Sequence, residues 1–165
     1  MRLPEDIVQL ANETGVALKA KGITIATAES CTGGLLSGAL TAIPGASDTF
    51  YGGFITYANE AKIAMVGVPY AVLREFGAVS KETAVAMAEG AMHAAGTHLA
   101  VSITGVAGPD GGTKDKPVGL VHFAVATEES TRHLRKAFDP TWSRDQIRHA
   151  SVTEALKLVK KAIAA

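Results

Sequence analysis

The sequence is short of cysteine, of net charge and of long apolar runs. Its one cysteine, Cys31, excludes a disulfide framework, and together with five scattered histidines it predicts no zinc site. Lysine and arginine together number 16, as do aspartate and glutamate, so the basic excess typical of a general nucleic-acid binder is absent. No run of about 18 apolar residues occurs, which argues against a membrane-spanning helix. We therefore expect neither nucleic acid nor a membrane as a partner.

What is present is the composition of a globular domain. The chain has 165 residues, of which 47% are hydrophobic and 19% charged, and this balance excludes a disordered chain. The first residues lead directly into an amphipathic pattern without the apolar core of a secretory signal, so we expect the reducing cytoplasm as the location. No internal repeat or Ser/Pro-rich linker divides the chain, and we expect one domain over residues 1–165.

Hydrophobic periodicity predicts alternating helices and strands. Helices are predicted over residues 4–21, 35–43, 59–66, 69–76, 81–95 and from about 144 onward. Strands are predicted over residues 23–28, 50–57, 98–104, 119–127 and 131–138, the last two as an antiparallel hairpin. We expect Ser80 to cap one helix, and Ser143 to form a capping box with Gln146 before the last one. This order predicts an α/β fold, namely a three-layer α/β/α sandwich around a mixed, mostly parallel sheet of about five strands.

Three polar residues stand where predicted strands end. Ser30, Tyr57 and Thr104 each lie at the carboxyl end of a strand. In sheets with a parallel core, ligands bind beyond these ends, where loops from neighbouring strands meet. The sequence therefore predicts a site at which these three positions converge.

The segment Glu29-Ser30-Cys31-Thr32-Gly33-Gly34 places hydroxyl groups at a strand-to-helix turn. One interpretation is structural, with Ser30 or Thr32 capping the next helix. The other is functional: Ser30 is a nucleophile, and free N–H groups at the start of the helix hold a phosphate or an oxyanion. Cys31 is a competing nucleophile, although a lone cysteine needs an activating base and no histidine lies nearby in the sequence.

A Ser30 nucleophile needs a base, and no Ser-His-Asp triad can be identified. Lys62, shortly after the second predicted strand, can serve if burial lowers its pKa from about 10.4 to about 7–8. Tyr57 could shuttle a proton or hold the lysine by a hydrogen bond. On the pattern alone, Lys62 also fits an ordinary solvated surface lysine.

A glycine-rich segment follows the third predicted strand. Residues 105–117 include Gly105 and Gly108, and this composition indicates either close approach of the backbone to a ligand or a mobile connection. The G-x-x-x-x-G-K-[ST] order of a Walker A loop is absent. Arg144 opens the last predicted helix, with Arg148 one turn later on the same face. Arginine at a helix N-terminus is either a phosphate ligand or an ordinary surface residue.

Taken together, four segments resemble the CinA C-terminal domain family in order and spacing: residues 28–34, 53–62, 77–80 and 104–112. The resemblance extends from about residue 7 to residue 163. It implies an α/β/α sandwich with a mixed sheet and nicotinamide-nucleotide amidase activity, which hydrolyses nicotinamide mononucleotide to nicotinate mononucleotide and ammonia in pyridine nucleotide salvage. Many relatives carry this domain behind a larger N-terminal domain, and the chain resembles the stand-alone form.

The resemblance also implies roles for particular residues. Ser30 is the implied nucleophile and Lys62 its base, with Tyr57 beside them. The implied substrate-binding residues, among which Arg144 and the glycine-rich loop would hold the ribose phosphate, are Cys31, Thr32, Gly33, Gly34, Thr104, Gly105, Gly108 and Arg144. The resemblance implies no metal and no cofactor, a small nucleotide as substrate, and a homo-oligomer, with a dimer favoured.

Three other functions are open on the sequence alone. The first is a non-catalytic module that senses a nucleotide through the same pocket, which ammonia release from nicotinamide mononucleotide would distinguish from the amidase. The second is a Ser-Lys peptidase, for which no extended peptide groove is evident. The third is a DNA-processing partner, suggested only by the family's designation as competence/damage-inducible, and the zero net charge argues against direct DNA binding.

Overall fold

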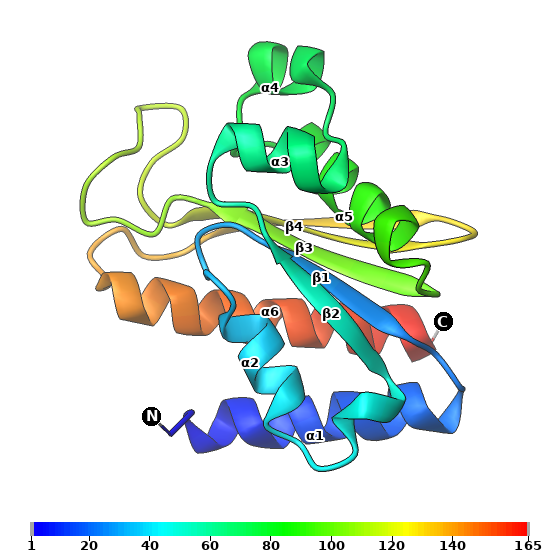
Figure 1. Ribbon diagram of the computed structural model, residues 1–165. Helices are drawn as coiled ribbons and strands as arrows, with labels where there is room; N and C mark the ends of the chain where they lie inside the picture. The colour runs from blue at the N-terminus through cyan, green and yellow to red at the C-terminus, as the bar shows by residue number, and fades with distance from the viewer. Residues whose placement is uncertain (1, 165) are drawn as a thin grey trace.

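The computed structural model describes residues 2–164, which form one five-stranded sheet with helices on both faces (Figure 1). The strands are β1 (Ile25–Glu29), β2 (Phe50–Ile55), β3 (Leu99–Gly105), β4 (Leu120–Thr127) and β5 (Thr131–Ala137). The helices are α1 (Glu5–Ala20), α2 (Leu35–Thr41), α3 (Asn59–Val66), α4 (Tyr70–Phe76), α5 (Lys81–Ala95) and α6 (Arg144–Ala164), with a short 3-10 helix at Ala46–Asp48. The predicted three-layer α/β/α sandwich is confirmed.

The sheet brings the carboxyl ends of three strands together. Its strand order is β2-β1-β3-β4-β5. β1 pairs in parallel with β2 and β3, whereas β4 pairs antiparallel with β3 and β5, so four of the five described strands share one direction. This confirms a mixed, mostly parallel sheet ending in a hairpin. At the end of β1, Glu29 is level with Ile55 on one side and with Ile103 on the other.

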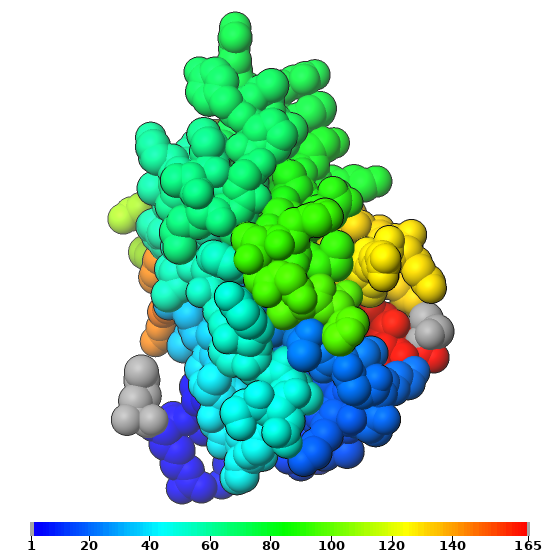
Figure 2. Space-filling view, turned by 45° about the vertical axis from the view of Figure 1, so that its right-hand side comes forward, coloured from blue at the N-terminus to red at the C-terminus, as the bar shows by residue number. Residues whose placement is uncertain are grey.

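The two faces of the sheet carry cores of different character, because side chains alternate along each strand. In β3, Leu99, Val101 and Ile103 pack with the apolar stripes of α1, α2 and α6, where burial of each large aliphatic side chain contributes roughly 1.5–3 kcal/mol. The alternate residues Ala100 and Ser102 are small and face the alanine-rich helix α5. Helices α3 and α4 extend this second layer and protrude at one end of the molecule (Figure 2).

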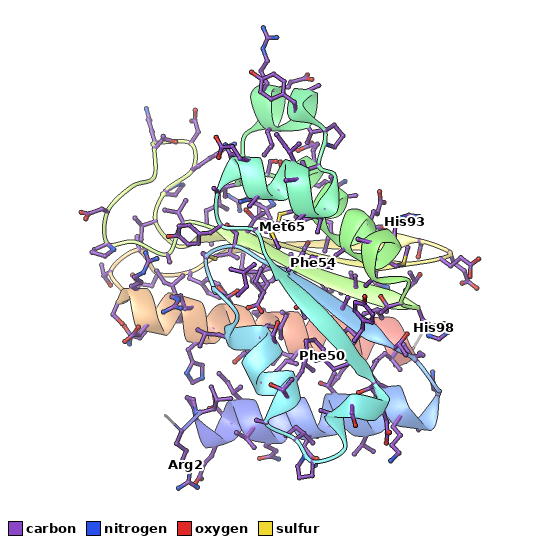
Figure 3. All side chains as sticks on the ribbon, viewed as in Figure 1. Arg2, Phe50, Phe54, Met65, His93 and His98 are labelled. Carbon is purple, nitrogen blue, oxygen red and sulfur yellow. The ribbon has the colours of Figure 1, made fainter. Side chains whose placement is uncertain are left out.

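A bulge in β2 directs one aromatic residue into each core. The register of β2 on β1 shifts between Ile25, opposite Phe50, and Ala26, opposite Gly52. The extra residue reverses the alternation. Phe50 therefore packs with the core under α1 and α6, and Phe54 with the core under α3 and α5 (Figure 3). Side chains of β2 are therefore packed into the cores on both faces of the sheet.

Both predicted helix caps are confirmed. The Ser80 hydroxyl accepts a hydrogen bond from the Thr83 N–H at 3.1 Å. Ser143 and Gln146 form a reciprocal capping box: the Ser143 hydroxyl accepts from the Gln146 N–H at 3.1 Å, and the Gln146 side-chain oxygen accepts from the Ser143 N–H at 2.8 Å. These contacts fix the start of α6, whose first residue is Arg144.

The predicted strand ends were less accurate. β1 begins at Ile25 instead of residue 23, because the Thr24 N–H donates to the His98 ring. β2 ends at Ile55 instead of residue 57, because the carbonyl groups of Thr56 and Tyr57 accept hydrogen bonds from Lys62.

Within residues 2–164, no helix combines the length and the apolar character needed to cross a membrane.

Candidate active site

A pocket of about 250 Å³ opens beyond the carboxyl ends of β1, β2 and β3. Eight of the eleven site residues predicted from the sequence line it, whereas Thr32, Gly33 and Gly34 do not. The lining residues come from five separate segments of the chain: Ser30, Cys31, Tyr57, Lys62, Ala78, Val79, Thr104, Gly105, Val106, Ala107, Gly108, Asp110 and Arg144.

Ser30 and Lys62 form a buried pair at the floor of this pocket. The Ser30 backbone is still held by the sheet, since its N–H donates to the Ile103 carbonyl at 3.0 Å. Lys62 extends from α3 and is only 1% exposed. Its amine donates to the Ser30 hydroxyl oxygen at 3.1 Å and to the carbonyl oxygens of Thr56 and Tyr57 at 2.7 and 3.1 Å.

This environment disfavours a charge on Lys62. None of its three hydrogen-bond partners is a carboxylate. Burial lowers the pKa of the Lys62 amine to about 8. A neutral amine has two N–H groups and one lone pair, which match two carbonyl acceptors and one hydroxyl donor. The neutral form therefore keeps every hydrogen bond, with the Ser30 hydroxyl now donating to the amine.

Cys31 is poorly suited to act as the nucleophile. Its side chain lies beside Ser30 in the pocket wall and is 5% exposed. Burial raises the pKa of the Cys31 thiol to about 11, so the thiol is protonated near neutral pH. A protonated thiol without a base in contact is unreactive, which favours Ser30.

The turn after β1 is held by Glu29, a residue to which the sequence pattern assigned no role. This fully buried carboxylate accepts hydrogen bonds from the N–H groups of Leu36 and Ser37 at 2.9 and 3.0 Å. It also accepts from the hydroxyl groups of Thr32 and Ser37, both at 2.7 Å. The expectation that free N–H groups at the start of the helix would face a ligand was thus wrong for these two groups, because Glu29 already binds them.

Thr32, Gly33 and Gly34 shape this turn and do not face the pocket. The Thr32 hydroxyl is directed to Glu29, and the two glycines border a separate surface hollow between α1 and α2. Gly33 and Gly34 have φ angles of 57° and 104°, a region that other residues adopt only with strain. Their predicted contact with substrate is not supported by this geometry.

Tyr57, Gly108 and Arg144 form the rim of the pocket. One guanidinium nitrogen of Arg144 donates to the Gly108 carbonyl at 2.7 Å, and the other donates to the Tyr57 phenol oxygen at 3.2 Å. The Tyr57 side chain therefore contacts Arg144, and only the Tyr57 carbonyl contacts Lys62. The Thr104 hydroxyl donates to the Ala78 carbonyl at 2.7 Å, which ties the loop before α5 to the end of β3.

Among residues 2–164, no cluster of three or more histidine, cysteine, aspartate or glutamate side chains is arranged to hold a metal ion. The groups that the pocket presents include the Ser30 hydroxyl, the Lys62 amine, whose charge is disfavoured, and the Arg144 guanidinium. Such a set suits nucleophilic attack on a carbonyl carbon of an anionic molecule.

We predict that Glu29→Gln destabilises the protein. The amide nitrogen would face N–H and O–H donors that now bind a carboxylate oxygen, at a cost of about 2–4 kcal/mol, or roughly 5–15 °C in Tm. Thermal unfolding followed by circular dichroism measures the change, with Glu13→Gln on the exposed face of α1 as the matched control. An unchanged Tm for Glu29→Gln would show that these hydrogen bonds do not hold the turn.

The fold and the pocket define an α/β/α protein with a buried Ser–Lys pair at the carboxyl end of its sheet. Comparison with known proteins assigns the family: the chain belongs to the CinA C-terminal domain family, whose model matches residues 7–163. A crystal structure of the competence/damage inducible protein CihA from Agrobacterium tumefaciens superposes with a TM-score of 0.95 at 43% identity, covering 100% of both chains.

Two relatives differ in how much of their length the chain spans. The chain is 48% identical over 155 residues to the nicotinamide-nucleotide amidohydrolase PncC of Escherichia coli (strain K12), covering 92% of each protein. It is 50% identical over 143 residues to a CinA-like protein of Synechococcus sp. (strain RCC307), covering 87% of this chain. The chain spans only about a third of that relative's length, namely 34%.

Proposed function

We propose that this chain is a nicotinamide-nucleotide amidohydrolase that converts nicotinamide mononucleotide to nicotinate mononucleotide and ammonia. The observation that carries the proposal is the 3.1 Å contact between the Lys62 amine and the Ser30 hydroxyl inside the pocket. The likeness to the Escherichia coli amidohydrolase supports the substrate class, because it extends over 92% of both chains. In this proposal, residues 1–165 act as one domain. We also propose that the chain forms a dimer.

In the acylation step, Ser30 attacks the carboxamide carbon while neutral Lys62 takes the hydroxyl proton. A C–O bond forms, and the carbonyl electron pair becomes an oxyanion, which N–H groups of the turn after Ser30 can stabilise. When the oxyanion collapses, the C–N bond breaks and protonated Lys62 gives its proton to the departing nitrogen. Ammonia leaves, and a nicotinoyl ester remains on Ser30.

In the deacylation step, a water molecule replaces ammonia. Lys62 is neutral again and takes a proton from this water as it attacks the ester carbon. Collapse of the second intermediate breaks the bond to Ser30, and Lys62 returns the proton to the serine oxygen. The product is nicotinate mononucleotide, and the enzyme is back in its starting state.

The lowered pKa makes this role of Lys62 quantitatively reasonable. At pH 7 a lysine with a pKa of about 10.4 is neutral in roughly one molecule in 2,500. With a pKa of about 8, the Lys62 amine is neutral in roughly one molecule in ten. The buried site therefore supplies the base form roughly 200 times more often than an exposed lysine does.

The direct test is to incubate the purified chain with nicotinamide mononucleotide. We expect ammonia and nicotinate mononucleotide in equal amounts, and far slower release from free nicotinamide, which lacks the ribose phosphate that orients the amide. Ammonia is measured by a coupled enzymatic assay and the nucleotide by chromatography. Binding of the nucleotide without any ammonia would favour the non-catalytic module instead.

We predict that Arg144→Ala mainly raises the KM for nicotinamide mononucleotide. Its guanidinium lines the pocket and bonds to Gly108 and Tyr57, not to the Ser30–Lys62 pair, and in this proposal it holds the phosphate. A charge-assisted phosphate contact is worth about 1.5–3 kcal/mol, which corresponds to a KM roughly 10- to 100-fold higher, with a smaller change in kcat. Arg132→Ala, on β5, is the matched control. An unchanged KM for Arg144→Ala would place the phosphate elsewhere.

A further inference from the structure

Arg148 contacts two carbonyl groups of the turn after Ser30. It lies on α6 one turn beyond Arg144, and it does not line the pocket. Its guanidinium donates to the Cys31 carbonyl at 3.1 Å and to the Thr32 carbonyl at 3.4 Å. These two bonds hold the Arg148 guanidinium against the turn.

Within residues 2–164, the N–H groups of Cys31 and Thr32 make no hydrogen bond to another residue, although both residues are buried. Buried N–H groups without partners are uncommon in folded proteins, so a pair of them next to a candidate nucleophile requires an explanation. Two other N–H groups of the turn do have acceptors within it. The Gly33 N–H donates to the Ser30 carbonyl at 3.1 Å, and the Leu35 N–H donates to the Thr32 carbonyl at 3.0 Å.

The planarity of the peptide bond links Arg148 to one of these free donors. In a trans peptide, the C=O of one residue and the N–H of the next point in opposite directions. Because Arg148 binds the Cys31 carbonyl on the α6 side, the Thr32 N–H is directed away from α6. In the same way, the bond from Gly33 to the Ser30 carbonyl fixes the direction of the Cys31 N–H.

We propose that Arg148 is a positioning residue that fixes the Cys31–Thr32 peptide and thereby holds the turn so that the N–H of Cys31, which lines the pocket, stabilises the oxyanion formed when Ser30 attacks. Glu29 binds the Thr32 hydroxyl and the Leu36 N–H, while Arg148 binds the Cys31 carbonyl. The Cys31 N–H, next to Ser30, is thereby left free to bind a ligand. The inference rests on the proposed role of Ser30 as nucleophile.

The test compares the same substitution at two positions on one helix. Arg148→Met should lower kcat for nicotinamide mononucleotide about 10- to 100-fold with little change in KM, because misplacing a group by about 1 Å costs roughly that much. Arg144→Met should raise KM instead. Should Arg148→Met fail to fold, Arg148→Lys keeps the charge but cannot bridge both carbonyl groups, and we expect the same kcat effect. A rise in KM alone at position 148 would overturn the inference.

A second measurement does not depend on the substrate. Diisopropyl fluorophosphate reacts with an activated serine: the serine oxygen bonds to phosphorus, the P–F bond breaks, fluoride leaves, and the base takes the hydroxyl proton. We expect labelling of Ser30, followed by mass spectrometry, to be at least about tenfold slower in Arg148→Met and unchanged in Arg132→Met, on β5 outside the pocket, since this reaction also develops charge on an oxygen. Equal rates in the two variants, or no labelling of the wild type, would contradict the role of Arg148. Labelling without ammonia release would reject only the proposed substrate.

Discussion

Ser30→Ala is expected to release ammonia from nicotinamide mononucleotide at least about 10³-fold more slowly than the wild type, because the nucleophilic oxygen is gone. The fold should be kept, since the Ser30 side chain makes its one hydrogen bond with Lys62 while its backbone remains bonded to β3. Initial rates of ammonia release measure the effect, and circular dichroism confirms the fold.

Cys31→Ala is the matched control for this serine variant. It removes one heavy atom from the next residue of the same turn, and the Cys31 thiol is buried with its pKa raised to about 11. We therefore expect activity within about tenfold of the wild type. The reverse pattern, with an active Ser30→Ala enzyme and an inactive Cys31→Ala enzyme, would transfer the nucleophile to Cys31.

Lys62→Arg should damage the enzyme nearly as much as Lys62→Ala. A guanidinium keeps the positive charge but stays protonated at neutral pH, so it cannot accept the Ser30 proton. General-base assistance contributes typically about 10²–10⁴-fold, and we expect losses in kcat/KM of this size for both variants. Near-normal activity of Lys62→Arg would show that position 62 supplies only charge.

The convergence of the site could be predicted because it depends only on strand direction. Ser30 and Tyr57 follow β1 and β2, and Thr104 lies at the end of β3. These three strands run in parallel, and the carboxyl ends of parallel neighbours must lie together. Lys62 was found for the same reason, since it lies on the first turn of the helix after β2. The roles of these residues, in contrast, came from their resemblance to a family.

The role of the Tyr57 side chain could not be derived from the pattern. Strand alternation was extended to residue 57, but β2 ends at Ile55, and beyond it the backbone presents carbonyl groups to Lys62. With the carbonyl directed inward, the phenol lies at the rim and contacts Arg144. The hydrogen bond between Tyr57 and Lys62 was predicted, but the pattern did not indicate that the Tyr57 carbonyl makes it.

The contacts of Glu29 and Arg148 were not predicted because they are specific to the folded turn. Glu29 reaches N–H groups seven and eight residues ahead, which requires the left-handed backbone of Gly33 and Gly34 between them. Arg148 reaches Cys31 across 117 positions of the chain. Periodic patterns in the sequence do not predict either contact. A carboxylate directly before a candidate nucleophile is nevertheless a feature from which a role for Glu29 could have been predicted.

The pH dependence of kcat/KM tests most directly whether neutral Lys62 is the base for Ser30. Only the unprotonated amine can accept the proton, so kcat/KM should rise about tenfold per pH unit below the lysine pKa, bend near pH 8 and level off above it. The substrate phosphate titrates near pH 6, roughly two units lower, and is therefore distinguishable. In the residual activity of Lys62→Ala, the bend near pH 8 should be absent. A wild-type profile that is flat between pH 6.5 and 9, or a bend that persists in Lys62→Ala, would contradict the assignment.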